Sequence, residues 1–561
     1  MRRPHLLIVG GLAAAVALLA LLGAVPSRAP DDGAGVAPAA GPLVAGDSSA
    51  APGVPCTGVR VAPGDDLQRA VDDHPRGTTF CLAAGVHHPA GVVPKDGQRF
   101  VGEGQDTILS GARPLPAAAA RRDDAGRWYW SGQTQRGGPH GTLVGTDGGV
   151  RANPGDRYDE ELFTSTSADP QAPPKRWRRV LSLTELGPGR WFLDQAAGRI
   201  YLSDDPARLG SIETSVAPSA IVAPPAARRS RVLVANLVVQ RYASPAQEPV
   251  IGGQGALDWD FRYVTVRDNH GAGAELGPGS VMENCSIQRM GQVGLLGGGD
   301  AGDRPTVLRD TEVTGNKALS FDPDWEAGGA KFTRVYGQGM VVENNWFHDN
   351  PGGGLWFDID NSNVVVRSNR FERNHYWGVL YEVSRRARIY WNQVVGTSRG
   401  PEGFPLDGAG IVVSNSEGVQ VTQNLLAGNA NGVLLREDRR VTRYAQDTYR
   451  QGIPHIQRVV VSDNDVATAA GGVTGMQVSN GDGPASWWQP SNARFSGNTY
   501  RSAPGGLRFL GPGNNHYSYD QWRALGNDPG GALRPASSPG SLPRQATAFV
   551  ASRYGALAGG D

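Results

Sequence analysis

Two acidic residues in similar segments of the chain are the strongest candidates for chemistry. Asp358 ends the segment GLWFD at 354–358, and Glu382 ends the segment GVLYE at 378–382. The two carboxyl groups therefore occupy the same position in two copies of one pattern. Paired carboxyl groups about 5 to 5.5 Å apart are the arrangement of retaining glycoside hydrolases, in which one is the nucleophile and the other the acid/base. The distance between the two carboxyl groups depends on the secondary-structure element that carries each copy of the pattern.

The pattern around these residues recurs along the chain from about residue 230. In each copy, alternating apolar and polar residues lead to an anchor position that is most often Asn. The anchors are Asn236, Arg262, Cys285, Thr311, Asn345, Asn369, Asn392, Asn424, Asn464 and Asn498. Short repeats that hold three strands and their turns predict an all-β fold, a right-handed parallel β-helix of about ten or more coils. We expect the Asn side chains to form an amide ladder between coils.

A second register of short strands begins after the glycines at 329, 354, 378, 410 and 432. Alternation sends the first and third residues of each strand into the core and the second and fourth to solvent. The two outward columns are Lys331, Trp356, Leu380, Val412 and Leu434, and then Thr333, Asp358, Glu382, Ser414 and Arg436.

The second column brings Asp358 and Glu382 together, because neighbouring strands lie about 4.8 Å apart. Like charges on adjacent strands destabilise a sheet, so a pair kept there favours a function over ordinary surface decoration. Their mutual repulsion is expected to raise the pKa of one carboxyl group, as a proton donor requires.

Aromatic and polar residues near this pair in the sequence are candidates for substrate contacts. Aromatic rings beside carboxylates are typical of sugar-stacking surfaces, and charged groups bind hydroxyls. The candidates are Trp325, Trp356, Tyr376 and Trp377 for stacking, and Glu326, Lys331, Asp360 and Arg436 for polar contacts. Taken singly, each charge is equally well explained as a solvated loop residue.

The N-terminus predicts export from the cytoplasm. Arg2 and Arg3 precede an uncharged apolar run, so residues 1–28 are interpreted as a signal peptide or as an N-terminal anchor that tethers the protein to the membrane. Residues 29–55, rich in Ala, Pro and Gly, are expected to be a linker. In an oxidising compartment Cys56 and Cys81 are expected to form a disulfide, whereas Cys285 lies in an apolar stretch and is expected to be buried.

Composition excludes several classes of function. The 561 residues contain 54 Lys and Arg against 54 Asp and Glu, so the chain as a whole has no basic footprint for nucleic acid. No Cys or His spacing indicates a metal site, and we expect no cofactor. We expect the partner to be a polysaccharide or oligosaccharide. The protein itself is expected to be a monomer that is secreted or anchored on the extracytoplasmic side of the cell membrane.

The stretch from Trp356 to Ser384 resembles the catalytic stretch of the β-helical xylosidases of glycoside hydrolase family 120. The resemblance implies that Asp358 is the nucleophile and Glu382 the acid/base. Ile359-Asp360 and Ser384-Arg385 stand where that family has a second aromatic residue and a His-Gly pair, so the resemblance leaves the sugar open.

The resemblance extends to the organisation of the chain. It implies an N-terminal cap with the first coils at 56–112 and an inserted β-rich module at 113–215. The β-helix with the site then covers 216–510. A solenoid needs its last core layer closed, so 511–535 is expected to be a C-terminal cap, followed by a tail at 536–561.

Two other functions fit the same scaffold. A polysaccharide lyase uses a Lys base with acidic residues just before it, which Glu326 and Lys331 imitate, although Trp356 stands where the Arg partner of such enzymes is expected. A noncatalytic glycan-binding or surface β-helix is the third class, and in it Asp358 and Glu382 are surface charges.

Overall fold

The computed structural model describes residues 56–144, 152–169, 172–400, 407–438, 452, 454–478, 488–489, 492–502 and 506–535. All of them belong to one compact unit, Leu43–Asp561. The expected signal peptide or anchor, the linker to residue 55 and the tail from 536 lie outside the described residues. Within the described part, no helix has the length and apolar character needed to cross a bilayer.

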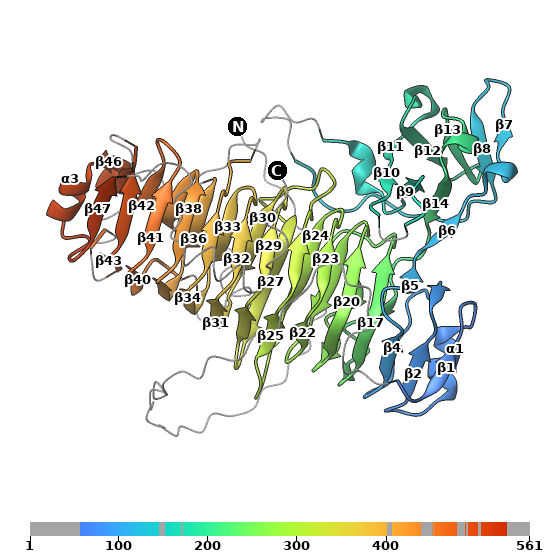
Figure 1. Ribbon diagram of the computed structural model, residues 1–561, viewed down its shortest axis with the longest axis horizontal. Helices are drawn as coiled ribbons and strands as arrows, with labels where there is room; N and C mark the ends of the chain where they lie inside the picture. The colour runs from blue at the N-terminus through green and yellow to red at the C-terminus, as the bar shows by residue number, and fades with distance from the viewer. Residues whose placement is uncertain are drawn as a thin grey trace. The chain divides into compact units, whose positions relative to one another are not determined.

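The predicted parallel β-helix is confirmed. Successive coils contribute three strands each, and each strand pairs in parallel with its counterpart in the next coil (Figure 1). The sheet that carries the candidate site contains β21 (Ala272–Leu276), β24 (Val293–Asp300), β27 (Gly328–Tyr336), β30 (Gly353–Asp358), β33 (Trp377–Glu382), β36 (Ala409–Ser414) and β39 (Asn431–Glu437).

The other strands of these coils belong to one larger sheet. Its first series includes β20 (Asp260–Arg267), β22 (Val281–Glu283), β25 (Thr306–Arg309), β28 (Met340–Glu343) and β31 (Ser362–Arg367). Its second series includes β23 (Ser286–Gln288), β26 (Glu312–Thr314), β29 (Trp346–His348) and β32 (Arg370–Glu372).

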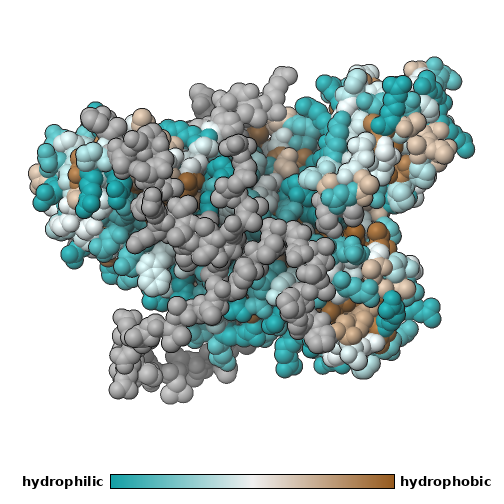
Figure 2. Space-filling view, in the orientation of Figure 1, coloured by the Kyte–Doolittle hydropathy of each residue, from teal (hydrophilic) through white to brown (hydrophobic). Residues whose placement is uncertain are grey.

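The interior is filled by the residues that alternation directs inward. Phe332, Phe357 and Tyr381 stack from coil to coil, with ring centroids 5.4 Å and 5.9 Å apart. All three are fully buried. Such stacks stabilise the helix because each coil buries the apolar surface of its neighbours. In the view of Figure 2, the described surface is correspondingly mostly hydrophilic.

The predicted amide ladder is present. Asn345 donates its backbone N–H and its side-chain amide to Oδ1 of Asn369, at 3.0 and 2.9 Å, and Asn369 does the same to Asn392. Buried amides cost little when each donor is satisfied in this way. The ladder continues through Asn424, Asn464 and Asn498.

Two anchors, Asn236 and Arg262, were assigned to the wrong residues. Leu237 and Val264 are register partners at the ladder position, and Oδ1 of Asn236 is buried without a hydrogen-bond donor. Arg262 is not the member of the ladder in its coil, because the backbone N–H of Val264 donates to Sγ of Cys285, at 3.4 Å. Cys285 is buried as expected, and burial raises the pKa of its thiol to about 12.

The two ends of the coil stack are closed by short helices. At the start, α1 (Leu67–Asp73) buries Leu67 and Val71. The expected disulfide joins Cys56 and Cys81, with their Cα atoms 5.7 Å apart. At the other end, Trp522 of α3 (Tyr519–Ala524) packs on Phe509, with ring centroids 5.5 Å apart.

Two small, mainly antiparallel sheets lie between the first coils and the rest of the helix in the sequence. One contains β6 (Ala112–Pro114), β9 (Leu162–Ser165), β10 (Lys175–Arg176) and β14 (Ser211–Ser215). The other, here called the inserted sheet, contains β7 (Arg121–Arg122), β8 (Trp128–Ser131), β11 (Arg178–Val180), β12 (Arg190–Asp194) and β13 (Arg199–Leu202). Trp130, Trp191 and Ile200 of the inserted sheet share a hydrophobic core with Leu162 and Ile212 of the other.

One expectation about the site-bearing sheet is wrong. The outward residues Trp356, Leu380, Val412 and Leu434 are not in solvent, because their exposed fractions are 6, 7, 4 and 1%. They form a second hydrophobic cluster with Tyr376, separate from the main core. Strands that are apolar on both faces are typical of sheets covered on both sides.

Candidate active site

Asp358 and Glu382 end neighbouring strands, β30 and β33. The register pairs Phe357 with Tyr381, so each carboxylate directly follows a paired residue. Each residue is 8% exposed. Both are therefore largely buried, so the expectation that this second column faces solvent is also wrong, but they occupy the adjacent positions that the repeat predicts.

A polar ladder fixes the backbone of both residues. The side-chain amide of Asn361 donates to the carbonyl of Asp358 at 2.9 Å. The hydroxyl of Ser384 donates to the carbonyl of Glu382 at 2.6 Å. The backbone N–H of Asn361 in turn donates to the Ser384 hydroxyl at 3.1 Å. These bonds hold the two strand ends in a common geometry.

The residue after each carboxylate is strained. Ile359 and Val383 have φ angles of 61° and 40°, in the left-handed region that β-branched residues avoid. Among the residues that the structure describes, no other Ile, Val or Thr has a positive φ angle. At the corresponding corner one coil later stands Asn415, a residue type that tolerates it. Backbone strain of this kind concentrates at functional sites, and it is a signal that sequence analysis missed.

Lys331 joins the candidate site from β27. Its Nζ lies 3.1 Å from Oδ2 of Asp358 and donates to the carbonyl of Trp325 at 2.6 Å. It also lies 3.7 Å from the centre of the Trp356 ring, a cation–π contact. The structure therefore places Lys331, Trp356 and Asp358 together.

Two of the expected sugar-binding carboxylates have partners within the protein. Glu326 is 3% exposed and accepts a hydrogen bond from the backbone N–H of Thr142 at 2.7 Å, and burial raises its pKa. Asp360 accepts from the hydroxyl of Tyr336 at 2.8 Å and pairs with Arg385 at 3.1 Å. Both carboxylates thus link chain segments beside the site.

The four aromatic candidates differ in exposure. Tyr376 is fully buried and Trp377 is 7% exposed, whereas Trp325 is 47% exposed. Trp377 packs edge-on against Trp356, with ring centroids 5.4 Å apart, and both line a small pocket with Lys331. The indole N–H of each is buried without a hydrogen-bond acceptor. Of the four, Trp325 offers the most accessible ring face.

Arg436 lies farther along the same sheet. Its register partner is Ser414, which is itself the partner of Glu382. Arg436 pairs with Asp438 at 2.7 Å, and the Ser414 hydroxyl lies 3.4 Å from Oε1 of Glu382. The structure therefore separates Arg436 from Glu382 by one intervening strand.

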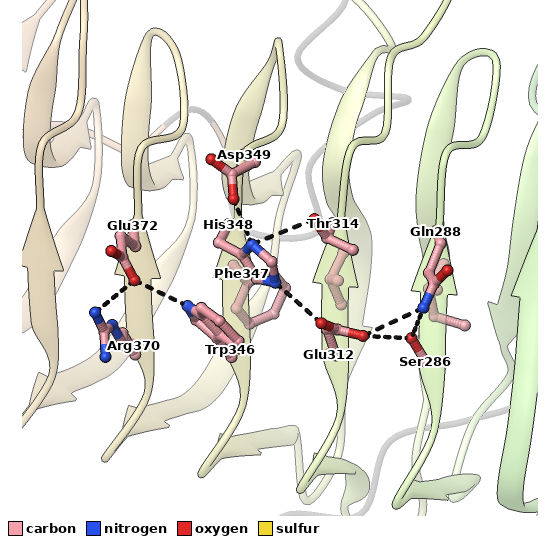
Figure 3. A network of polar contacts seen from close by, with 12 residues as sticks. Ser286, Gln288, Glu312, Thr314, Trp346, Phe347, His348, Asp349, Arg370 and Glu372 are labelled. Atoms are coloured by element: carbon pink, nitrogen blue, oxygen red, sulfur yellow. Dashed lines mark hydrogen bonds and ion pairs between the residues drawn. The ribbon is translucent and has the colours of Figure 1, made fainter. Parts of the chain in front are cut away.

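A second polar network, which sequence analysis also missed, lies on β23, β26, β29 and β32 (Figure 3). His348 bridges Oε1 of Glu312 at 3.1 Å and Oδ2 of Asp349 at 2.6 Å. Glu372 pairs with Arg370 at 2.6 Å. Every carboxylate of this network faces a cationic or donor group, so we assign the network to stabilisation of the coils.

Among the described residues, no group of three or more His, Cys, Asp or Glu side chains is arranged to hold a metal ion.

Comparison with known proteins confirms the fold. Residues 250–443 match the family described as right handed beta helix region. The structure is similar to that of XylC with xylose, with 12% identity, a TM-score of 0.58 and coverage of 83% of this chain and 82% of that one. At this identity the similarity shows the fold. No curated protein matches the sequence.

Two further solved structures are similar at lower TM-scores. The A-module of the mannuronan C-5 epimerase AlgE6 of Azotobacter vinelandii has 13% identity, a TM-score of 0.43 and coverage of 86% of this chain and 97% of that one. The catalytic unit of an α-1,3-glucanase from Streptomyces thermodiastaticus has 10% identity, a TM-score of 0.44 and coverage of 88% and 72%.

Proposed function

We propose that this protein is an exported carbohydrate-active enzyme, a glycoside hydrolase that acts with retention at the anomeric carbon. One observation carries the proposal: two carboxylates directly follow paired residues on adjacent strands, where strands lie about 4.8 Å apart. That spacing suits retaining hydrolysis, which needs carboxyl groups about 5 to 5.5 Å apart. The disulfide supports an extracytoplasmic location.

In the proposed mechanism Asp358 is the nucleophile. Its carboxylate attacks the anomeric carbon while Glu382 gives its proton to the glycosidic oxygen, so the glycosidic bond breaks and a glycosyl ester forms. Glu382 then takes a proton from water, the water oxygen attacks the anomeric carbon, and the ester bond to Asp358 breaks. The sugar leaves with its original configuration.

Lys331 and Trp325 are proposed to orient the substrate and the nucleophile. The ion pair with Lys331 holds one oxygen of Asp358 in place and leaves the other to react. The exposed ring of Trp325, next to the carbonyl that Lys331 contacts, gives a sugar a surface for stacking.

The contacts of Lys331 disfavour the lyase alternative. A lyase base must be neutral to take a proton, whereas the ion pair with Asp358 and the position over the Trp356 ring both use the cationic ammonium group. Lys331 is therefore proposed to act as a positioning residue.

The test is a screen of the full chain against aryl glycosides and polysaccharides, run beside Asp358→Ala, Glu382→Ala and Lys331→Ala. We expect hydrolysis to fall about a thousandfold or more with either carboxylate variant. Glu343→Gln, which neutralises a carboxylate on β28, is the matched control and is expected to retain activity.

Product analysis separates the three functions. Unsaturated products that disappear with Lys331→Ala and persist with Asp358→Ala would assign the protein to the lyases. Polysaccharide binding without turnover, unchanged in both carboxylate variants, would assign it to the noncatalytic class.

A further inference from the structure

The inserted sheet has a face that the proposed active site does not use. One face packs on the core of the module, and the alternate residues Phe192, Tyr201 and Tyr129 lie on the other. The register pairs Phe192 with Tyr201, and Tyr201 with Tyr129. The three rings therefore form a row across β12, β13 and β8.

The rings of this row lie close together, and the guanidinium groups of two arginines lie over them. The ring centroids of Tyr129 and Tyr201 are 5.7 Å apart, and those of Phe192 and Tyr201 are 6.3 Å apart. Arg199 lies 4.5 Å above the Tyr129 ring and donates to the Tyr201 hydroxyl at 3.3 Å. Arg127 lies 5.8 Å from the Tyr201 ring. Stacking of this kind holds guanidinium groups in defined orientations.

The same face has an excess of positive charge. The arginines on this face are Arg121, Arg127, Arg178, Arg190 and Arg199. The accompanying carboxylates are Asp123, which pairs with Arg127 at 2.7 Å, and Asp194. Arg178 and Arg190 are register partners on adjacent strands. Like charges in that position destabilise a sheet, so their placement calls for an anionic partner.

We propose that this basic aromatic face binds an acidic polysaccharide, a chain whose sugar units carry carboxylate or sulfate groups. Guanidinium groups bind such anions through paired hydrogen bonds. Tyr201 is only 5% exposed, so the half-buried rings of Phe192 and Tyr129 are the ones that can pack against the apolar faces of sugars. Arg121, Arg178 and Arg190 are exposed and accessible to a ligand. The overall neutrality of the chain conceals this local charge.

A glycan is the occupant that the setting favours. The disulfide indicates an oxidising compartment outside the cytoplasm, where polysaccharides are abundant and nucleic acids are not the usual partners. The face is built without Asp358 or Glu382. Binding there is therefore independent of the proposed hydrolase activity.

The experiment measures retardation of the full chain in native gels that contain polygalacturonate, dextran sulfate or neutral xylan. The variants are the double charge reversal Arg121→Glu with Arg190→Glu, and Tyr129→Ala. Arg208→Glu is the matched control, because Arg208 is exposed in the same module but lies in the short 3-10 helix Pro206–Arg208. Thermal unfolding and aryl-glycoside hydrolysis are followed in parallel.

We expect an acidic polysaccharide to retard the wild-type chain, and salt to weaken the effect. The double reversal should lower affinity about tenfold or more through lost charge-assisted hydrogen bonds, without lowering aryl-glycoside hydrolysis. Arg208→Glu should bind as the wild type does. Equal retardation by neutral xylan, equal competition by a single-stranded oligonucleotide, or no retardation of the folded wild-type chain would overturn the proposal.

Discussion

Two outward columns of the β-helix differ in how their charged residues are arranged. On β22, β25, β28 and β31, one column alternates in sign from coil to coil: Glu283, Arg309, Glu343 and Arg367. Arg367 pairs with Glu343 at 2.6 Å, and Arg309 pairs with Glu283. On the other sheet, Asp358 and Glu382 place two carboxyl groups on adjacent strands, and Lys331 pairs with Asp358 at 3.1 Å.

The difference distinguishes a structural column from a candidate functional one. The alternating column satisfies each charge with its neighbours, so it needs no role beyond holding the coils in register. Asp358 and Glu382 are two acidic neighbours that cannot pair with each other, and the left-handed Ile359 and Val383 beside them add backbone strain. Natural proteins retain such costs where activity requires them.

The alternating column is broken most severely by Glu343→Lys. This change places a third positive side chain between Arg309 and Arg367. We expect it to lower the free energy of unfolding by about 1 to 2 kcal/mol, because two attractions become two repulsions. Chemical denaturation measures the effect, and Glu343→Gln should cost less. Equal costs for Lys and Gln would show that the alternation of charge contributes nothing.

The strain beside the candidate nucleophile is tested by Ile359→Asn. Asn tolerates the left-handed conformation that costs a β-branched residue about 1 to 2 kcal/mol, so we expect the variant to gain about 1 kcal/mol of stability. Thermal unfolding checks the gain, and Ile359→Val, which keeps the branching, should not show it. A loss of stability with Asn would mean that the Ile359 side chain contributes more through packing than it costs in strain.

The charge repulsion within the candidate site is tested by Glu382→Gln. At a pH at which both carboxyl groups are ionised, removing one of the two charges should raise stability by about 0.5 kcal/mol, and hydrolysis should fall sharply. Denaturant unfolding in low salt is the appropriate measurement, because salt screens the repulsion. A stability decrease would show that the contacts of Glu382, among them the Ser414 hydroxyl 3.4 Å from its Oε1, outweigh the repulsion.

An effect on the pH dependence of stability is expected from Glu275, which lies in the column of Lys331. Burial, followed by the nearby charge of Glu248, raises the pKa of Glu275 from its ordinary 4.5 to about 7. The folded state therefore holds this proton more tightly than the unfolded state, and stability falls as the pH rises from about 4.5 to about 7.

Glu275→Gln should remove this part of the pH dependence and leave the rest of the profile unchanged. Unfolding midpoints measured between pH 4 and 8 check it. Parallel profiles for the wild type and the variant would contradict the raised pKa.

The repeat made much of the fold predictable. Asn345, Asn369 and Asn392 recur at the spacing of a coil because each side chain bonds to the next coil, and this short-range rule is visible in the sequence. The position of Asp358 beside Glu382 follows from the same rule. The anchors at Asn236 and Arg262 were misassigned because the ladder positions of those coils hold the apolar residues Leu237 and Val264.

The environment of the candidate site was less predictable. Burial of Trp356 and Leu380 depends on what covers the outer face, and alternation within a strand contains no information about that. The partners of Glu326 come from Thr142 and Gln247, which are distant in the sequence. The strain at Ile359 and Val383 depends on the corners of the coils, so it appears only in three dimensions.

The most direct test of the central claim is to trap the covalent intermediate. The full chain is incubated with the 2-deoxy-2-fluoro analogue of the aryl glycoside that the activity screen identifies, and the labelled peptide is sequenced by mass spectrometry. We predict one sugar attached to Asp358, with labelling abolished by Asp358→Ala and retained in Glu343→Gln. Attachment to another residue, or turnover of the parent glycoside with inversion at the anomeric carbon, would contradict the account.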